Sequence, residues 1–395
     1  MKKFRLETDI AHYGEDRTVH EGAVVPPIYQ NSLFTFKSWE DIDSAFDNPV
    51  ENSIYTRGRN PTVALAEKKI AKIAGGEKAK LFSSGMAAIS SAIMHYINSG
   101  DHVITLDNIY GPTNNFFNEY LRKKFNVEVT FITGKEIEEF EKAIKYNTIL
   151  IYIESPSSAV FSLQDISKVT ALAKRHKIHT IIDNTWATPI FQKPLSMGID
   201  LEVHSCSKYI GGHSDIVAGV VIGKEKDIRE IFLTEHALFG AKLAPFEAWL
   251  IIRSLRTLPI RMKKHQESAL TVAKYLYSHP KIKKVSYPGL ENFPQYELGK
   301  KQMTGFTGLM SFEIESDKLE EIKQFFNSLE VFQIGVSWGG HESLIYAPAI
   351  SYLKELSPQQ FKNMGISLGT MRISVGLEDS QDLIEDLENS FKYIG

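Results

Sequence analysis

Two polar segments of the chain combine residue types that could do chemistry together. One is Asp183-Asn184-Thr185, and the other is HSCSKY at 204–209, which contains Lys208. A lysine amine can form a Schiff base with a carbonyl compound, and pyridoxal 5'-phosphate (PLP) is the leading cofactor of this kind. The Asp183 carboxylate could keep the PLP ring nitrogen protonated, and Ser205 and Ser207 could bind the phosphate. The two segments therefore suggest a PLP site.

A third segment, Ser84-Gly85-Met86, lies where a loop is expected to enter a helix. A glycine there lets a phosphate approach the backbone, and the start of a helix offers free N–H groups. The simpler interpretation of Ser84 is an ordinary N-cap. Asp183 likewise follows an apolar run, so it could be only a turn former. The order of phosphate loop, aspartate and lysine favours the cofactor site.

Four further residues could bind an anion or a ring, each with a structural alternative. Arg57 and Arg59 could hold a phosphate or carboxylate, or be solvated surface charges. Tyr110 follows an expected strand and could stack on a ring, or be a half-buried turn residue. Arg372 interrupts an apolar strand, which favours an anionic partner.

Composition excludes several other classes of protein. The 395 residues are 43% hydrophobic and carry a net charge of −3, so neither a nucleic-acid partner nor a membrane is expected. The apolar stretches are too short for a membrane-spanning helix. Cys206 is the only cysteine, which excludes an internal disulfide and suits a reducing cytoplasm. Histidines such as His204 and His213 leave open a metal-dependent hydrolase, but no His-x-x-x-His or His-Glu-x-x-His spacing occurs, so no metal is expected.

The pattern along the chain predicts an α/β fold with three parts. Residues 1–54 lack a sustained period and predict an extended arm. Residues 55–245 alternate helical patterns with short β-rich runs, which predicts a mainly parallel sheet covered by helices. Residues 246–395 predict a smaller α+β domain. The predicted strands are 102–106, 127–132, 148–153, 180–182, 219–222, 308–314 and 371–375.

Taken together, these motifs resemble the Cys/Met-metabolism family of PLP-dependent enzymes over nearly the whole chain. The segments that carry the resemblance are YTRGRNPT at 55–62, SGM at 84–86, DNTWATP at 183–189, HSCSKY at 204–209, GHSD at 212–215, SWGG at 337–340 and Arg372. The resemblance implies the fold of aspartate aminotransferase (PLP fold type I) and a homotetramer built from dimers with shared active sites.

The resemblance also implies a role for each site residue. Lys208 would form the Schiff base, Asp183 would pair with the ring nitrogen, and Tyr110 would stack on the ring. The cofactor phosphate would be bound by Gly85, Met86, Ser205 and Ser207, and by Tyr55 and Arg57 of the neighbouring subunit. The carboxylate of a sulfur amino acid would be bound by Ser337 and Arg372.

Several positions bear on the substrate. Trp338 in the SWGG segment and Trp186 resemble cystathionine β-lyases, whereas γ-synthases and γ-lyases more often have leucine at 338. Pro112 stands where methionine γ-lyases typically have cysteine. The segments at 55–62 and 217–222 look more like the γ-type branch. Two further departures are Ser207, where threonine is usual, and Ser158, where many members have asparagine.

The expected activity is α,β-elimination on L-cystathionine, giving homocysteine, pyruvate and ammonia, with Lys208 as base and Lys208 or Tyr110 as proton donor. Such a reaction belongs to transsulfuration and methionine biosynthesis, or to cysteine metabolism. The alternatives are γ-elimination or γ-replacement with the same residues, or a cofactor-binding protein without lyase activity.

Overall fold

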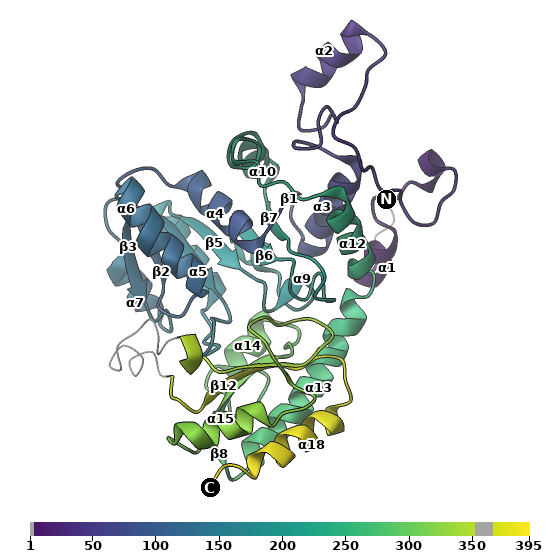
Figure 1. The fold of residues 1–395 in the computed structure, drawn as a ribbon. Helices are drawn as coiled ribbons and strands as arrows, with labels where there is room; N and C mark the ends of the chain where they lie inside the picture. Colours follow the sequence, from purple (N-terminus) through teal and green to yellow (C-terminus); the bar gives the residue numbers. More distant parts are fainter. Residues whose placement is uncertain (1–3, 352–365) are drawn as a thin grey trace.

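The computed structural model describes residues 4–351 and 366–395, and two β-sheets organise them (Figure 1). The larger sheet has seven strands in the order β1-β7-β6-β5-β4-β2-β3. Its strands are β1 (Lys78–Phe82), β2 (His102–Leu106), β3 (Glu128–Ile132), β4 (Thr148–Glu154), β5 (His179–Asp183), β6 (Leu201–Ser205) and β7 (Gly219–Gly223). All neighbours are parallel except β7, which pairs antiparallel with β1 and β6. The predicted mainly parallel sheet is therefore confirmed.

The smaller sheet lies in the C-terminal part of the chain and has the strand order β10-β11-β12-β9-β8. Its strands are β8 (Ile282–Ser286), β9 (Leu309–Ile314), β10 (Gln333–Ile334), β11 (Leu344–Tyr346) and β12 (Thr370–Ser374). The central pairs β9–β12 and β11–β12 are antiparallel. Antiparallel strands packed on helices give the α+β character that the sequence predicts for this region.

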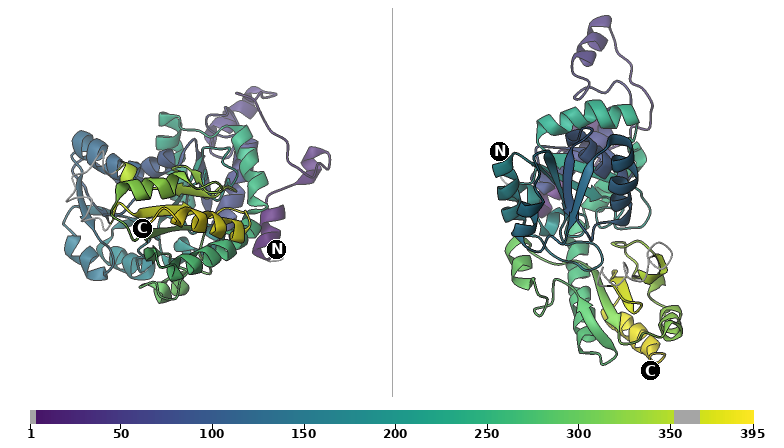
Figure 2. Two further views of the ribbon diagram at one scale, coloured as in Figure 1. Left: turned by 60° about the horizontal axis from the view of Figure 1, so that its bottom comes forward. Right: turned by 90° about the vertical axis from the view of Figure 1, so that its left-hand side faces the viewer.

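Helices cover both faces of the larger sheet, as the edge-on view in Figure 2 shows. The helices up to β7 are α3 (Pro61–Ala74), α4 (Gly85–Tyr96), α5 (Gly111–Asn115), α6 (Arg122–Phe125), α7 (Ile137–Ala143), α8 (Ile166–His176) and α9 (Thr188–Phe191). Helix α8 begins after Asp165, whose side chain accepts from Lys168 N at 3.1 Å and caps the helix. Its residues Ile166, Val169 and Leu172 are buried against the sheet.

Two long helices connect the sheets. The helices after β7 are α10 (Glu225–Ile231), α11 (Ala237–Phe239), α12 (Pro245–Leu255), α13 (Leu258–Ser278), α14 (Tyr296–Gln302), α15 (Leu319–Asn327) and α18 (Ser380–Phe391). Buried residues of α12, including Ala248 and Ile251, pack in one core with Ile70 of α3, on the side of the larger sheet. In contrast, Val272 and Leu276 of α13 pack in the core of the smaller sheet. The domain boundary predicted at residue 246 stays a prediction. Helix α12 begins at this boundary, yet its buried residues pack with α3 beside the larger sheet.

The N-terminal residues form an arm with two short helices, α1 (Leu6–His12) and α2 (Trp39–Asp47). Helix α1 packs near α3, whereas α2 lies away from the rest of the protein in Figure 1 and in the right-hand view of Figure 2. On α2, Trp39 is 80% exposed and Phe46 is 63% exposed. Large apolar side chains that project in this way suit a surface that another molecule covers. In the described residues, no helix is long and apolar enough to cross a membrane.

Candidate active site

A cavity of about 500 Å³ lies where the carboxyl ends of β4, β5 and β6 face the smaller sheet. Open parallel sheets bind ligands at this edge. The cavity brings together most of the site residues that the sequence predicts. They are Gly85, Met86, Tyr110, Asp183, Ser205, Ser207, Lys208, Ser337 and Arg372. Tyr55 and Arg57 are not among the residues that line it.

Lys208 follows β6 and projects its amine into this cavity. Its Nζ donates a hydrogen bond to Ser337 Oγ at 2.8 Å and lies 5.5 Å from the ring centroid of Trp338. Burial, and then the positive charge of Arg372, lower the pKa of Lys208 to about 8, while the Asp183 carboxylate opposes the shift. A lysine with this pKa is partly neutral near neutral pH, as a nucleophile or base must be.

The rate at which the cofactor-free protein captures PLP should therefore rise with pH up to about 8 and level off above it. Only the neutral amine attacks an aldehyde, and its fraction rises as pH passes through the pKa of Lys208. An ordinary lysine, with a pKa of about 10.4, would still gain neutral amine well above pH 9. Stopped-flow absorbance at the Schiff-base band measures this rate. A rate that climbs steeply between pH 9 and pH 10 would contradict the lowered pKa.

Asp183 is the last residue of β5 and is 8% exposed. Its Oδ1 accepts hydrogen bonds from the Thr185 N–H at 2.9 Å and from Thr185 Oγ1 at 2.5 Å. Burial raises the pKa of Asp183, and these two hydrogen bonds oppose the rise. A protonated ring nitrogen at Oδ2 would offset the cost of burying this carboxylate. The site is therefore suited to the role predicted for Asp183.

One end of the active-site cavity is formed by the first turn of α4 and by the end of β6. A side chain at Gly85 would collide with Ser205, because an added Cβ would lie 2.9 Å from the Ser205 Cβ. The N-cap interpretation of Ser84 is confirmed, since its Oγ accepts from Ala87 N at 3.0 Å. Ser207 Oγ accepts from Ala218 N at 3.0 Å. The free N–H groups of α4 and the Ser205 hydroxyl make a compact cradle that fits a phosphate.

Arg372 lies on β12 of the smaller sheet, and Ser337 lies in the loop between β10 and β11. Arg372 lies on β12 between the buried residues Met371 and Ile373, and its Nη2 donates to Val336 O at 2.6 Å. Its guanidinium also lies 5.0 Å from the ring centroid of Tyr346. These contacts hold the guanidinium at the cavity wall, and its predicted role towards a carboxylate remains a prediction.

Glu154 also lines the cavity, although no role for it was predicted from the sequence. Its Oε2 accepts a hydrogen bond from the backbone N–H of Tyr110 at 2.7 Å. Tyr110 is the N-cap of α5 and is 45% exposed. The sequence offered one signal for Glu154, a carboxylate directly after the apolar run of β4, which is the pattern that drew attention to Asp183 on β5.

Tyr55 and Arg57 lie on the surface at the end of the arm. Arg57 Nη1 donates to Ala237 O at 2.7 Å, and Tyr55 is 50% exposed and bridges to Leu33. The structure of one chain therefore does not bring them to the cavity that contains Lys208. This placement is compatible with the expected action on a neighbouring subunit, which remains a prediction.

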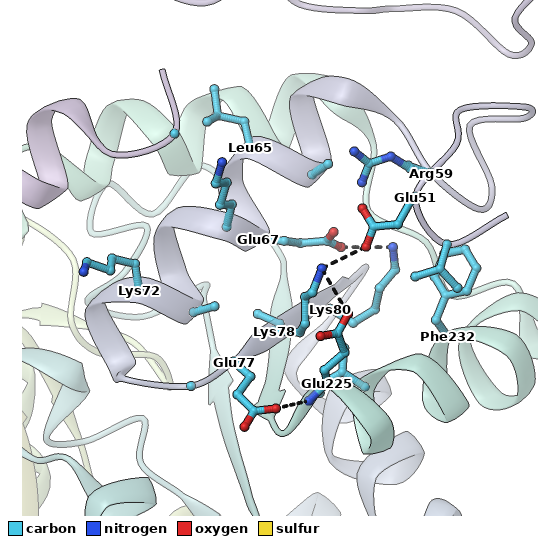
Figure 3. Close-up of a pocket in the computed structure, with 18 of the residues that line it drawn as sticks. Glu51, Arg59, Leu65, Glu67, Lys72, Glu77, Lys78, Lys80, Glu225 and Phe232 are labelled. Carbon is cyan, nitrogen blue, oxygen red and sulfur yellow. Dashed lines mark hydrogen bonds and ion pairs between the residues drawn. The ribbon is translucent and has the colours of Figure 1, made fainter. Parts of the chain in front are cut away.

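A second cavity, of about 550 Å³, lies among α3, β1 and α10 (Figure 3). Its charged side chains pair with one another. Lys78 contacts Glu51 at 2.8 Å and Glu225 at 3.4 Å, and Lys80 contacts Glu67 at 3.1 Å. These pairs fix the arm residue Glu51 on the larger sheet. Lys78 and Lys80 of this cavity therefore have carboxylate partners that hold the structure together.

The histidines near Lys208 have structural partners as well. His204 Nε2 lies 2.7 Å from Glu202 Oε1, and neither side chain is exposed. His213 Nδ1 lies 2.7 Å from Gly211 O. Within residues 4–351 and 366–395, no group of three or more histidine, cysteine, aspartate or glutamate side chains is arranged to hold a metal ion.

Known proteins provide an independent view of this chain. Residues 7–392 match the family model described as Cys/Met metabolism PLP-dependent enzyme. An L-methionine gamma-lyase of Treponema denticola is 40% identical over 99% of this chain and 97% of its own length. A cystathionine beta-lyase of Coxiella burnetii is 36% identical over 98% of both chains.

A crystal structure from Campylobacter jejuni, provisionally named an O-acetylhomoserine (thiol)-lyase, superposes with a TM-score of 0.92 at 32% identity. It covers 98% of this chain and all of its own, and it contains an N'-pyridoxyl-lysine-5'-monophosphate. The expected PLP fold type I is thereby confirmed, and these relatives support a PLP-dependent lyase of sulfur amino acid metabolism. Matched over nearly its whole length, the chain belongs to the Cys/Met-metabolism family of PLP-dependent enzymes, and PLP is its cofactor.

Proposed function

We propose that this enzyme is a carbon–sulfur lyase that cleaves L-cystathionine by α,β-elimination, giving homocysteine, pyruvate and ammonia. The observation that carries the proposal is the position of the Lys208 amine. It lies within hydrogen-bond distance of Ser337, in the same cavity as the Asp183 carboxylate and the Arg372 guanidinium. One cavity thus holds an amine that would act as the base, a carboxylate that would pair with the ring nitrogen and a guanidinium that would bind the substrate carboxylate.

In this proposal Lys208 moves the proton on the substrate α-carbon. Its lowered pKa, about 8, provides neutral amine once the substrate has displaced it from the cofactor. PLP, when bound, supplies the electron sink that makes this proton removable. Asp183 contributes the negative charge that favours a protonated ring nitrogen, and Arg372 orients the amino acid by its carboxylate.

Tyr110 or Lys208 would donate the proton that the departing sulfur needs. Burial raises the pKa of Tyr110, and the Asp183 and Glu154 carboxylates raise it further while Arg372 opposes them. The phenol therefore stays protonated near neutral pH, which suits a proton donor better than a base. A thiol leaves, and the three-carbon remnant takes up water to give pyruvate and ammonia.

The β-specificity rests on the wall formed by Trp338. Its indole packs edge-to-face on Tyr209, with ring centroids 5.5 Å apart, and lies over the Lys208 amine. A bulky rigid ring here limits the space around the reacting carbons, and it is also the residue that resembles cystathionine β-lyases. The similarity to an L-methionine gamma-lyase favours the second candidate, γ-elimination or γ-replacement by the same residues.

The keto acid released from cystathionine distinguishes the two candidates. We expect pyruvate together with homocysteine, identified by mass spectrometry after reaction with the purified PLP-loaded enzyme. 2-Oxobutyrate together with cysteine would establish γ-elimination instead. A PLP-loaded enzyme that produces no keto acid from cystathionine or from methionine would reject the lyase proposal. Lys208→Ala serves as the inactive control.

Replacing Arg372 by leucine should weaken substrate binding far more than cofactor binding. Removing one partner of a desolvated charge pair costs on the order of 2–5 kcal/mol, which is roughly 30-fold or more in the Michaelis constant. Steady-state kinetics and PLP titration measure the two effects separately. Arg372→Lys, which keeps the charge but loses the planar fork, should fall between the parent and Arg372→Leu. An unchanged Michaelis constant in Arg372→Leu would make Arg372 a structural charge.

The proposal includes an active site shared between two copies of the chain, within a homotetramer. The exposed ends of the arm and the apolar surface near it support this arrangement, since Leu238 is 77% exposed and Phe239 is 68% exposed next to the residue that Arg57 contacts. Tyr55 and Arg57 would then reach the phosphate of the neighbouring chain.

The lone Cys206 is buried, and we expect a cytoplasmic location.

Mixing Arg57→Ala protein with Lys208→Ala protein should restore activity if the site is shared. After subunit exchange, a mixed dimer contains one site with both an intact Lys208 and an intact Arg57. Up to about a quarter of the parent activity is expected from random exchange, because half of the dimers are mixed and each has one intact site out of two. Arg59→Ala, which changes the cation two residues away, should be active without mixing. Impaired parents that exchange subunits but regain no activity would place Arg57 outside its neighbour's site.

A further inference from the structure

Glu154 places a second carboxyl group in the active-site cavity, beside that of Asp183. Strands β4 and β5 are parallel neighbours, and Glu154 is the register partner of Asp183. Partners in a parallel pair point to the same face of the sheet, and both residues end their strands. Both side chains line the active-site cavity.

The Glu154 carboxyl joins two loops that border the cavity. Oε2 accepts from the backbone N–H of Tyr110 at 2.7 Å, in the loop after β2, and Oε1 accepts from Ser158 Oγ at 2.5 Å, in the loop after β4. A third contact closes the arrangement, because Ser158 N donates to Asn108 O at 3.0 Å. Because one carboxyl accepts from both loops, it holds the two loops in a fixed position relative to each other.

We propose that Glu154 is a positioning residue, which holds Tyr110 against the cofactor ring through the Tyr110 backbone N–H. No charge is needed for this role, because the carbonyl oxygen of a neutral acid accepts the same hydrogen bond. The inference rests on the proposed function only for the choice of substrate. In this arrangement Tyr110 would contact the cofactor and the leaving group, whereas Glu154 would act through it.

The electrostatics of the pair agree with an uncharged role. Burial, and then the neighbouring Asp183 carboxylate, raise the pKa of Glu154 to about 8, against the hydrogen bonds from Ser158 and Tyr110. Two carboxylates side by side in a buried site resist joint ionisation, so one proton stays with the pair. Lys208 and His204 near Asp183 lower the pKa of the Asp183 carboxyl and so favour its ionised form. The shared proton therefore stays on Glu154.

Three substitutions at this site separate positioning from other roles. Glu154→Gln keeps a carbonyl that accepts from Tyr110 N and an amide that can donate to Ser158, so it should behave like the parent. Glu154→Ala removes both contacts and should lower kcat by about 10²-fold, the effect of a misplaced reacting group, with the substrate Michaelis constant little changed. Ser158→Ala removes only the second contact and should have a smaller effect.

Cofactor binding gives a readout that does not depend on the substrate. In Glu154→Ala, PLP should bind roughly 2- to 10-fold more weakly, the contribution of one aromatic stacking contact, and the circular dichroism of the bound cofactor should change. In Glu154→Gln both should match the parent. If the parent binds PLP but cleaves no sulfur amino acid, the proposed lyase function fails while this binding test still applies.

A double-mutant cycle with Tyr110→Phe completes the test. Because Glu154 acts through the Tyr110 phenol, the loss of kcat in Glu154→Ala should be much smaller in the Tyr110→Phe background than in the parent. Three outcomes would overturn the proposal. They are parent-like behaviour of Glu154→Ala, a Glu154→Gln as impaired as Glu154→Ala, and fully additive losses in the cycle. Thermal unfolding of each variant shows whether a loss comes from misfolding.

Discussion

Lys208→Ala should abolish turnover, with a loss of at least ~10⁴-fold, the upper end of what general acid–base catalysis contributes. Both the covalent link to PLP and the movement of the α-proton require this amine. The measurement is keto-acid release by the purified variant under saturating PLP. The loss should exceed that of any other single substitution in the cavity.

Lys208→Arg is the matched control, because it keeps a positive charge at this position and still cannot form a Schiff base. It should be as inactive as the alanine variant, with a similar melting temperature to the parent. Activity in either variant near the parent rate would overturn the assignment of Lys208 as the cofactor-binding base.

Asp183→Ala should retain some PLP and lose about 10²–10³-fold in rate, the typical effect of removing one group that stabilises charge in a transition state. Without the carboxylate the ring nitrogen loses its proton and PLP becomes a weaker electron sink. Single-turnover absorbance of the bound cofactor, followed during reaction with substrate, measures the step that is slowed.

Two further variants of Asp183 separate charge from structure. Asp183→Asn can still accept the hydrogen bonds of Thr185, so it should fold like the parent and yet lose most of the rate. Asp183→Glu keeps the charge and should retain more activity than Asp183→Asn. An Asp183→Asn enzyme that works at the parent rate would show that the carboxylate is only a turn former at the end of β5.

The sequence predicted the central strands of the larger sheet best, since most of their residues are apolar. β2, β4 and β5 were found almost to the residue because they are buried on both faces, as central strands of a parallel sheet are. β6 was missed because Glu202 and His204 make it look half-exposed. In the structure, both side chains are fully buried and pair with each other. No pattern along the chain reveals a partner of this kind.

The edge strand β1 was missed for a related reason. Its segment alternates lysine with apolar residues, and this pattern is typical of surface charges at positions such as Lys80. In the structure, Lys80 is almost completely buried, where its amine contacts Glu67 of α3 at 3.1 Å and the ring of Phe232. A buried cation becomes tolerable only when tertiary packing supplies an anion and an aromatic face.

The parts of the active site that lie in short, continuous segments of the chain were predicted from the sequence. Lys208, Asp183 and the segment 84–86 are recognisable because each lies at a strand or helix end with the right neighbours. Glu154 was not recognised, since its relation to Tyr110 and Asp183 depends on the order of β2, β4 and β5 in the sheet. The action of Tyr55 and Arg57 depends on a second chain, which the sequence alone does not position.

Borohydride reduction of the PLP-loaded enzyme, followed by peptide mass mapping, identifies the lysine that forms the Schiff base with PLP. Reduction converts the Schiff base into a stable pyridoxyl-lysine, so the modified residue is identified by its mass. We expect one modified lysine per chain, on the peptide that contains Lys208, and loss of the visible absorbance band. A modification on another lysine, or an unmodified Lys208 in enzyme that had bound PLP, would contradict this expectation.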